Sequence, residues 1–229
     1  MTTYESCYHA MLNDTGRRDI PRWASAVLDE VALHRTSIAG VRHPLGFVCL
    51  PVERTGEAGV CVHVWSDSLA RESPTTSTMH AHSWDLISYV LYGSVRNEVI
   101  DVIDASDDAA YRVFEVRSSG DIDELRETPR LVRSEIRTTE LKGPGDIYSL
   151  AAGVFHTTVV HGEAATVALG SSRRGMRDLS LGEITRKTHW IRRQRCDRGE
   201  TAAAARVVTE WLARIRTINQ ENRGDLRRP

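Results

Sequence analysis

The stretch TMHAHSWDLISYVLYGSV, residues 78–95, places two histidines one residue apart and continues as an apolar run up to Gly93. Alternate residues of a β-strand share a face, so the side chains of His80 and His82 point the same way, roughly 7 Å apart along the backbone. Two imidazoles aimed at one point in a protein interior are costly to bury unless a divalent metal shares their lone pairs. The stretch therefore predicts two metal ligands on one strand. A solvent-facing pair, or core histidines bonded to backbone carbonyls, are the alternatives.

The sequence around this strand, from about residue 45 to 169, consists of short runs rich in Val, Ile, Thr and aromatic residues, bounded by Gly, Pro and Asp. Roughly nine runs have this β-like composition, and they include LGFVCLPV (45–52), GVCVHVW (59–65) and ATVALGS (165–171). So many short strands without a helical pattern between them predict an antiparallel sandwich or barrel. The polar segment 118–129 is predicted to be a loop.

Helical patterns flank this β-rich segment. Pro21 suits the first position of a helix after Asp19. The residues that follow recur with helical spacing on one stripe, which consists of Trp23, Val27, Leu28 and Val31. Near the other end, TAAAARVVTEWLARI (201–215) has one apolar face, made of Val207, Val208, Trp211, Leu212 and Ile215. This face predicts a helix packed on the outside of the sheet.

The length sets the domain organisation. A chain of 229 residues suits one sizeable core with helical additions. We expect an N-terminal helical extension over residues 1–44, a β-barrel over residues 45–175 and a C-terminal helical extension over residues 176–229.

The composition is that of an ordinary soluble protein, with 41% apolar and 27% charged residues. The net charge of −1 creates no field that would recruit nucleic acid or anionic lipid. No apolar run approaches the ~20 residues that span a bilayer, and the first residues lack the apolar segment of a signal peptide. The four cysteines show no CxxC spacing, which favours reduced thiols over a disulfide or zinc framework. The sequence therefore predicts a cytoplasmic protein without a nucleic-acid or membrane partner.

A second segment, GPGDIYSLAAGVFHTTVV (143–160), carries a further histidine in a β-like context. Gly145 and Gly153 can open tight turns before and after a short strand, and His156 then begins the next strand. A ligand from a neighbouring strand would complete one triangular face of a metal's coordination sphere. His156 is a candidate for that third ligand.

The two segments together resemble the two sequence boxes of the cupin superfamily. The spacing of His80, His82 and Gly93 is similar to that of the first box. The spacing of Gly145, Gly153 and His156 is similar to that of the second box. Ala151 stands where the family often has proline. The resemblance covers the whole β-rich segment. It implies an all-β core, folded as the double-stranded β-helix or jelly-roll barrel of cupins, with N- and C-terminal helices.

The resemblance also implies that His80, His82 and His156 are the metal ligands. Cupins commonly add a glutamate four or five residues after the second histidine, where this chain has apolar residues. Asp85 comes one residue early, and strand alternation turns it away from His82. We therefore expect Asp85 to support the site from behind or to lie at the surface. Three imidazoles would leave up to three positions of an octahedral ion open.

Three-histidine sites of this kind are similar to those of the thiol dioxygenases and diketone-cleaving dioxygenases. The resemblance implies Fe(II) as the cofactor, with Zn, Ni, Mn or Cu as alternatives because imidazole binds several transition metals. Two features of the enzymes that oxidise cysteine are missing. Residues 45–52 contain no arginine for a substrate carboxylate, and Ala168, Gly170 and Ser172 occupy the positions of a Ser-His-Tyr relay. Cysteine itself is therefore not the expected substrate.

Other residues are candidates for contacts with the substrate. Tyr89 and Tyr148 lie on the strands of the two boxes, and we expect catalytic roles for them as hydrogen-bond partners of substrate or O₂. His63 and Trp65 alternate on one strand, and together with Trp84 they are the expected substrate contacts. The alternatives are tyrosines that only satisfy their own hydroxyls, and a strand whose His63 face lies under a helix.

These observations favour a small non-haem iron dioxygenase, an oxidoreductase whose partners are O₂ and a small-molecule substrate. A redox-silent isomerase or lyase that uses its metal as a Lewis acid is one alternative. A non-catalytic cupin that only binds a small molecule is another. Because cupins often pair through sheet edges or helical extensions, the resemblance also implies a homodimer as one form of assembly.

Overall fold

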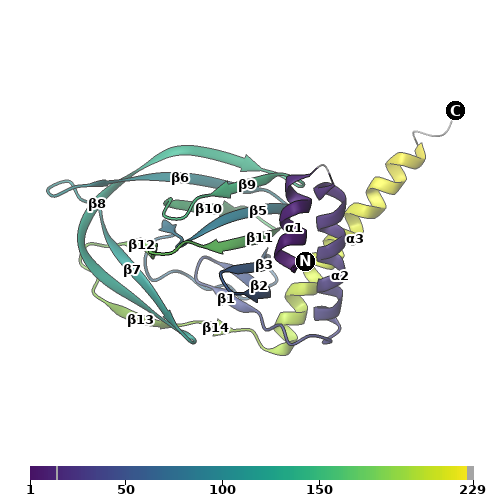
Figure 1. Ribbon diagram of the computed structural model, residues 1–229, viewed down its shortest axis with the longest axis horizontal. Coiled ribbons are helices and arrows are strands. Elements are labelled where there is room, and N and C mark those ends of the chain that lie inside the picture. Colours follow the sequence, from purple (N-terminus) through teal and green to yellow (C-terminus); the bar gives the residue numbers. More distant parts are fainter. Residues whose placement is uncertain (14, 226–229) are drawn as a thin grey trace.

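The computed structural model describes residues 1–13 and 15–225, and Figure 1 shows their arrangement. The strands of this part of the chain form two antiparallel sheets of seven strands each. Three helices, which come from the two ends of the chain, lie together along one side of the β-structure (Figure 1). The predicted all-β core with N- and C-terminal helices is therefore confirmed.

The first sheet, sheet A, has the strand order β14-β1-β2-β3-β11-β5-β9. Its strands are β1 (Val41–His43), β2 (Phe47–Thr55), β3 (Ala58–Trp65), β5 (Trp84–Tyr92), β9 (Ile147–Leu150), β11 (Ala164–Ser172) and β14 (Gln194–Arg195). β11 pairs with β3 on one side and with β5 on the other, so three of the strands expected from the sequence form the middle of this sheet.

The second sheet, sheet B, has the order β13-β8-β6-β10-β4-β12-β7. Its strands are β4 (His80–Ala81), β6 (Val95–Asp104), β7 (Tyr111–Ser119), β8 (Ile122–Lys142), β10 (His156–Val160), β12 (Asp178–Gly182) and β13 (His189–Arg192). The long strand β8 pairs with β7 along its first half and with β6 along its second half. Because β7 also pairs with β12, sheet B closes on itself.

The helices are α1 (Thr3–Leu12), α2 (Gly16–Ala32) and α3 (Arg198–Asp225). α2 begins earlier than the sequence predicted, because the N–H groups of Arg18 and Asp19 both donate to the Thr15 carbonyl at 2.9 Å. Pro21 therefore lies inside the helix and not at its first position. Since proline has no N–H, the helix loses one backbone hydrogen bond there.

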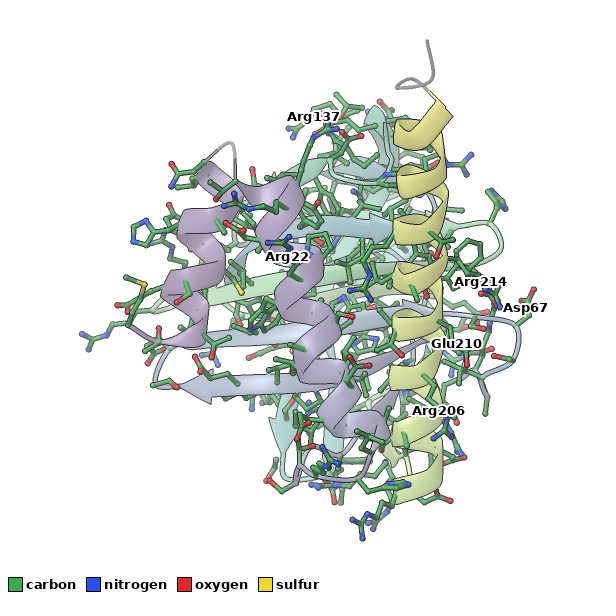
Figure 2. The ribbon with its side chains drawn as sticks, turned by 90° about the vertical axis from the view of Figure 1, so that its right-hand side faces the viewer. Arg22, Asp67, Arg137, Arg206, Glu210 and Arg214 are labelled. Carbon is green, nitrogen blue, oxygen red and sulfur yellow. The ribbon has the colours of Figure 1, made fainter. Side chains whose placement is uncertain are left out.

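α3 packs on sheet A as the apolar face of residues 201–215 predicted. Val208 and Leu212 are buried in the cluster between the helices and the sheet. Figure 2 shows the helices in front of the strands, with the exposed charged side chains of Arg206, Glu210 and Arg214 along one side of α3. None of the helices that the structure describes is long and apolar enough to cross a membrane.

Sheet A is buried on both faces. One face packs against the helices through residues such as Val62, Leu91 and Leu169. The other face carries Phe47, Trp65, Leu86, Val90 and Ala168, which pack with Val95 and Val99 of sheet B. This second face, between the two sheets, is the side on which the candidate ligands lie.

The strands extend beyond the predicted barrel of residues 45–175. β1 begins at Val41, and β12, β13 and β14 lie within residues 178–195, so the predicted C-terminal helical extension becomes helical at Arg198. Segment 118–129, predicted as a loop, forms the turn at Gly120 and the first part of β8. The loop prediction was wrong because the polar residues of this segment alternate along a strand with buried residues such as Leu125, which is 4% exposed.

Candidate metal centre

His80, His82 and His156 converge between the two sheets. β4 carries His80, His82 follows two residues later, and β10 begins with His156, which pairs directly with His80. One ligand nitrogen of each ring lies within 4.8 Å of those of the other two. The Nε2 atoms of His80 and His82 are 3.2 Å apart. The strand register therefore brings together three imidazoles from two separate segments of the chain.

Backbone carbonyls orient two of these rings. Nδ1 of His80 lies 2.8 Å from the Thr78 carbonyl oxygen, and Nδ1 of His156 lies 3.1 Å from the Val154 carbonyl oxygen. A ring that donates its Nδ1–H to a carbonyl carries its lone pair on Nε2, which is the arrangement typical of metal-binding histidines. The local backbone therefore prepares these rings to bind through Nε2.

Burial lowers the pKa of each of the three imidazoles. The pKa of His156 falls from 6.5 to about 3, mainly through burial and to a smaller extent through the nearby His80. The pKa of His80 is lowered by burial, and that of His82 falls well below its usual value through burial and the neighbouring histidines. The rings are therefore neutral at neutral pH and can donate their lone pairs to a metal.

The donor set fits a divalent transition metal. Two nitrogens bound at ~2.1 Å to adjacent positions of an octahedral ion lie about 3.0 Å apart, which is close to the 3.2 Å between His80 and His82. No carboxylate of the described residues joins the group. Asp178, on β12, acts on His80 through its charge, but its Oδ1 accepts the N–H of Ser83 at 2.6 Å. Asp178 was not among the predicted site residues, because it lies beyond the predicted end of the barrel.

Trp84 lies against the candidate ligands. Its ring stacks on His82, with centroids 4.0 Å apart and an interplanar angle of 22°. Gly170 on β11 makes room for the indole, because a Cβ at this position would lie 2.9 Å from Cε3 of Trp84. A predicted substrate contact is thus placed directly beside the three histidines.

His63 and Trp65, the other predicted substrate contacts, also face the space between the sheets. The Phe47 ring centroid lies 4.5 Å from that of His63 and 4.9 Å from that of Trp65. His43 stacks on Phe47 with centroids 4.4 Å apart. His43 was not among the predicted site residues, because it lies opposite Phe47 only through the register of β1 and β2, which the sequence pattern does not reveal.

The two tyrosines lie on different faces of sheet A. Tyr89 is 2% exposed and packs in the cluster between the sheet and the helices, together with Met11 of α1. The structure therefore places Tyr89 on the wrong face for a catalytic role at the histidines. Tyr148 packs in the cluster between the sheets, where burial raises the pKa of its phenol.

Tyr148 has polar neighbours between the sheets. It pairs with Ser88 across β9 and β5, and the nearby polar side chains of Ser88 and Asn97 lower its pKa against the larger effect of burial, which raises it. The Ser88 hydroxyl and the Asn97 amide nitrogen are buried and lack close partners in the described part of the chain. An unpaired buried polar group costs about 1–3 kcal/mol, so this patch is suited to a polar group of a ligand.

Asp85 points away from the histidines. Its carboxylate accepts a hydrogen bond from Arg173 Nε at 2.7 Å and one from the Ala152 N–H at 2.9 Å. These bonds hold its pKa below the usual value. Ala152 lies in the turn that leads to His156, and Gly153 in the same turn donates its N–H to the His82 carbonyl at 2.8 Å. Asp85 therefore contacts the turn before a candidate ligand and contacts no ligand itself.

The burial of His43 predicts that the metal-free protein loses stability on acidification. Burial, and then the nearby His63 and His80, lower the pKa of His43 from 6.5 to about 3. Between these pH values the unfolded chain binds a proton that the native chain does not, so the free energy of unfolding falls as the pH falls. The His43→Asn variant can still accept the Leu45 N–H that Nδ1 of His43 accepts at 3.2 Å. We expect urea denaturation at several pH values, with chelator present, to show that the free energy of unfolding falls less steeply with decreasing pH in this variant than in the wild type. Equal dependence on pH in the two proteins would contradict the prediction.

Comparisons with known proteins give matches at the level of structure. No protein-family model and no curated protein matches the sequence. An RmlC-like cupin from Shewanella frigidimarina NCIMB 400 matches over 61% of this chain and 87% of its own, with 13% identity and a TM-score of 0.37. KdgF from Halomonas sp. matches over 56% and 82%, with 17% identity and a TM-score of 0.32.

Hydroquinone 1,2-dioxygenase from Sphingomonas sp. TTNP3, with 4-hydroxybenzoate bound, matches over 53% of this chain and 64% of its own, with 12% identity and a TM-score of 0.34. Similarities of this size say nothing about substrate or reaction. The two antiparallel sheets and the three converging histidines are features of the chain itself, and they define an antiparallel β-structure with a candidate metal site between its sheets.

Proposed function

We propose that this chain is a metal-dependent oxygenase of the cupin class, in which His80, His82 and His156 hold Fe(II) and O₂ reacts with a small-molecule substrate. The convergence of three neutral imidazoles without a carboxylate supports this proposal most strongly. Iron held there would supply the redox chemistry through which O₂ reacts with an organic molecule. Because three protein ligands leave coordination positions free, substrate and O₂ can both approach.

Apolar side chains keep water away from this side of the site. Trp84 covers one face of His82, and Phe47 and Trp65 pack between the sheets close to His63. An environment of this kind strengthens the hydrogen bonds and charge interactions that a bound substrate makes. We therefore expect the substrate to place an apolar part against the indole of Trp84.

Polar groups between the sheets can orient the substrate. The unpaired Ser88 hydroxyl and Asn97 amide nitrogen are both at most 3% exposed, and Tyr148 lies beside them. Each would gain a hydrogen bond from a polar substrate group without losing one to the protein. In this proposal Tyr148 orients the substrate, while Tyr89 has no part in the reaction.

The proposal is tested on protein purified without oxygen and loaded with Fe(II). Nitric oxide stands in for O₂, so a ferrous nitrosyl signal in electron paramagnetic resonance would report an open position at the iron. O₂ uptake is then measured with a panel of phenols, diketones and thiols. We expect a nitrosyl signal, and O₂ uptake that depends on one substrate class.

Two matched samples give the controls. Protein loaded with Zn²⁺ should take up no O₂, because zinc has no redox chemistry. The Trp84→Ala variant should keep the nitrosyl signal but require more substrate for the same uptake. Iron-loaded protein that gives no nitrosyl signal would overturn the proposal, as would O₂ uptake that is equal in the zinc-loaded sample.

A further inference from the structure

A second group of metal-binding side chains lies on sheet A. Cys49 of β2 pairs directly with His63 of β3, and Cys61 lies two residues before His63 on the same strand. One ligand atom from each of the three lies within 4.8 Å of those of the other two. All three are partly buried, and both thiols are free.

The group faces sheet B and not the helices. Cys49 packs with the cluster between the sheets, and Cys61 pairs with Ala168, which belongs to that cluster. His63 contacts Phe47 in the same space. The group therefore lies in the same interior as the three histidines, but it uses different residues from different strands.

Two cysteine sulfurs and one histidine nitrogen are ligand types that zinc sites use. The pKa of the Cys61 thiol is lowered by a hydrogen bond from Cys49 and by a further one from His63, although burial acts in the opposite direction. The contact with Cys61, together with burial, raises the pKa of Cys49. Thiolate is the form of cysteine that binds metals.

We propose that Cys49, Cys61 and His63 form a second metal site, which binds Zn²⁺ through two thiolates and one imidazole. Zn–S bonds of ~2.3 Å and a Zn–N bond of ~2.0 Å place the ligand atoms of a tetrahedral ion roughly 3.5–3.8 Å apart. The ligand atoms of these three side chains already lie within 4.8 Å of one another, so small movements of the side chains would complete the site. Binding releases the two thiol protons to solvent, and the two thiolates then balance the charge of the ion.

Two donor sets of different softness allow the barrel to hold two metals. Thiolates select zinc and other soft or borderline ions, whereas three imidazoles bind several divalent metals with less discrimination. With three ligands from the protein, the Cys49, Cys61 and His63 site leaves the fourth position of a tetrahedral ion for a ligand from outside this group. The proposal does not depend on which metal the three histidines hold.

The site is tested with Co²⁺ as a spectroscopic probe on full-length reduced protein. Both sites can take Co²⁺, but a thiolate ligand alone gives an intense sulfur-to-cobalt charge-transfer band in the near ultraviolet. We expect this band in the wild-type protein, and we expect Zn²⁺ to remove it. The Cys61→Ser variant should lose the band, and the His63→Gln variant should show a weaker band. The His156→Ala variant should keep it.

A matched control and a thiol count complete the test. Cys196 is buried outside the group, so Cys196→Ser should keep the band in full. After zinc loading and desalting, Cys61→Ser should retain one equivalent of zinc fewer than the wild type. The wild-type measurement requires no variant to fold. A wild-type protein whose four thiols titrate as reduced and that gives no band would overturn the proposal, and so would a band that persists in Cys49→Ser/Cys61→Ser.

Discussion

Replacing His156 with alanine should abolish metal binding between the sheets. His156 is 2% exposed, and its ring is one of the three whose ligand nitrogens lie within 4.8 Å of one another. Loss of a group that only supports a ligand costs 10–100-fold in metal affinity. We therefore expect the loss of a ligand to lower the affinity for Fe(II) by more than about 100-fold, measured as iron retained after anaerobic loading and desalting.

The measurement should be made in a Cys61→Ser background, so that the thiols do not contribute. Thermal unfolding gives an independent readout, because a metal that binds the native state stabilises it by about 2.7 kcal/mol at 100 times its Kd. Iron should therefore raise the Tm of the parent protein and leave that of the His156→Ala variant unchanged. His161→Ala is the matched control, since His161 is exposed just after β10. An equal rise in Tm for all three proteins would contradict a ligand role.

The part of the site that lies within one short segment, residues 80–84, follows from the sequence, although this segment is not the single strand that the sequence predicted: β4 ends at Ala81 and β5 begins at Trp84. The sequence spacing predicts neighbouring side chains for His80, His82 and Trp84, and Trp84 does stack on His82 across the break between the two strands. Within β5, alternation from Trp84 puts Tyr89 on the opposite face, so the expected catalytic role of this tyrosine conflicted with the period of its own strand. The structure agrees with the period, because Tyr89 packs beneath the helices.

The part of the site that depends on pairing between strands does not follow from the sequence. Cys49 and His63 become neighbours through the register of β2 and β3, which includes an irregularity after Pro51. His43 joins them through the short strand β1, which no alternation reveals. A sequence pattern fixes which face a residue takes, but it does not fix which residue of another strand lies opposite it.

Replacing Gly93 with alanine should destabilise the whole barrel. Gly93 directly follows β5 and has a φ of +75°, and a Cβ there would lie 2.1 Å from the Glu163 carbonyl oxygen and 2.7 Å from Cα of Ala164. Both are backbone atoms that cannot rotate away, so β5 and the start of β11 would have to separate. Glu163 also accepts hydrogen bonds from Ser66 Oγ and Trp211 Nε1, each at 2.6 Å, which tie this turn to α3.

A second glycine separates the cost of the clash at Gly93 from the cost of placing alanine in a left-handed backbone conformation. Gly56, in the turn between β2 and β3, has a φ of +57° with no atom within 4 Å of an added Cβ. Gly56→Ala should therefore cost about 1–2 kcal/mol, which is the penalty of the left-handed region alone. Gly93→Ala should cost more than about 4 kcal/mol, which is a large share of the 5–15 kcal/mol that holds a typical domain folded. Urea denaturation measures both, and equal losses would show that the turn at Gly93 opens more easily than its contacts with Glu163 and Ala164 imply.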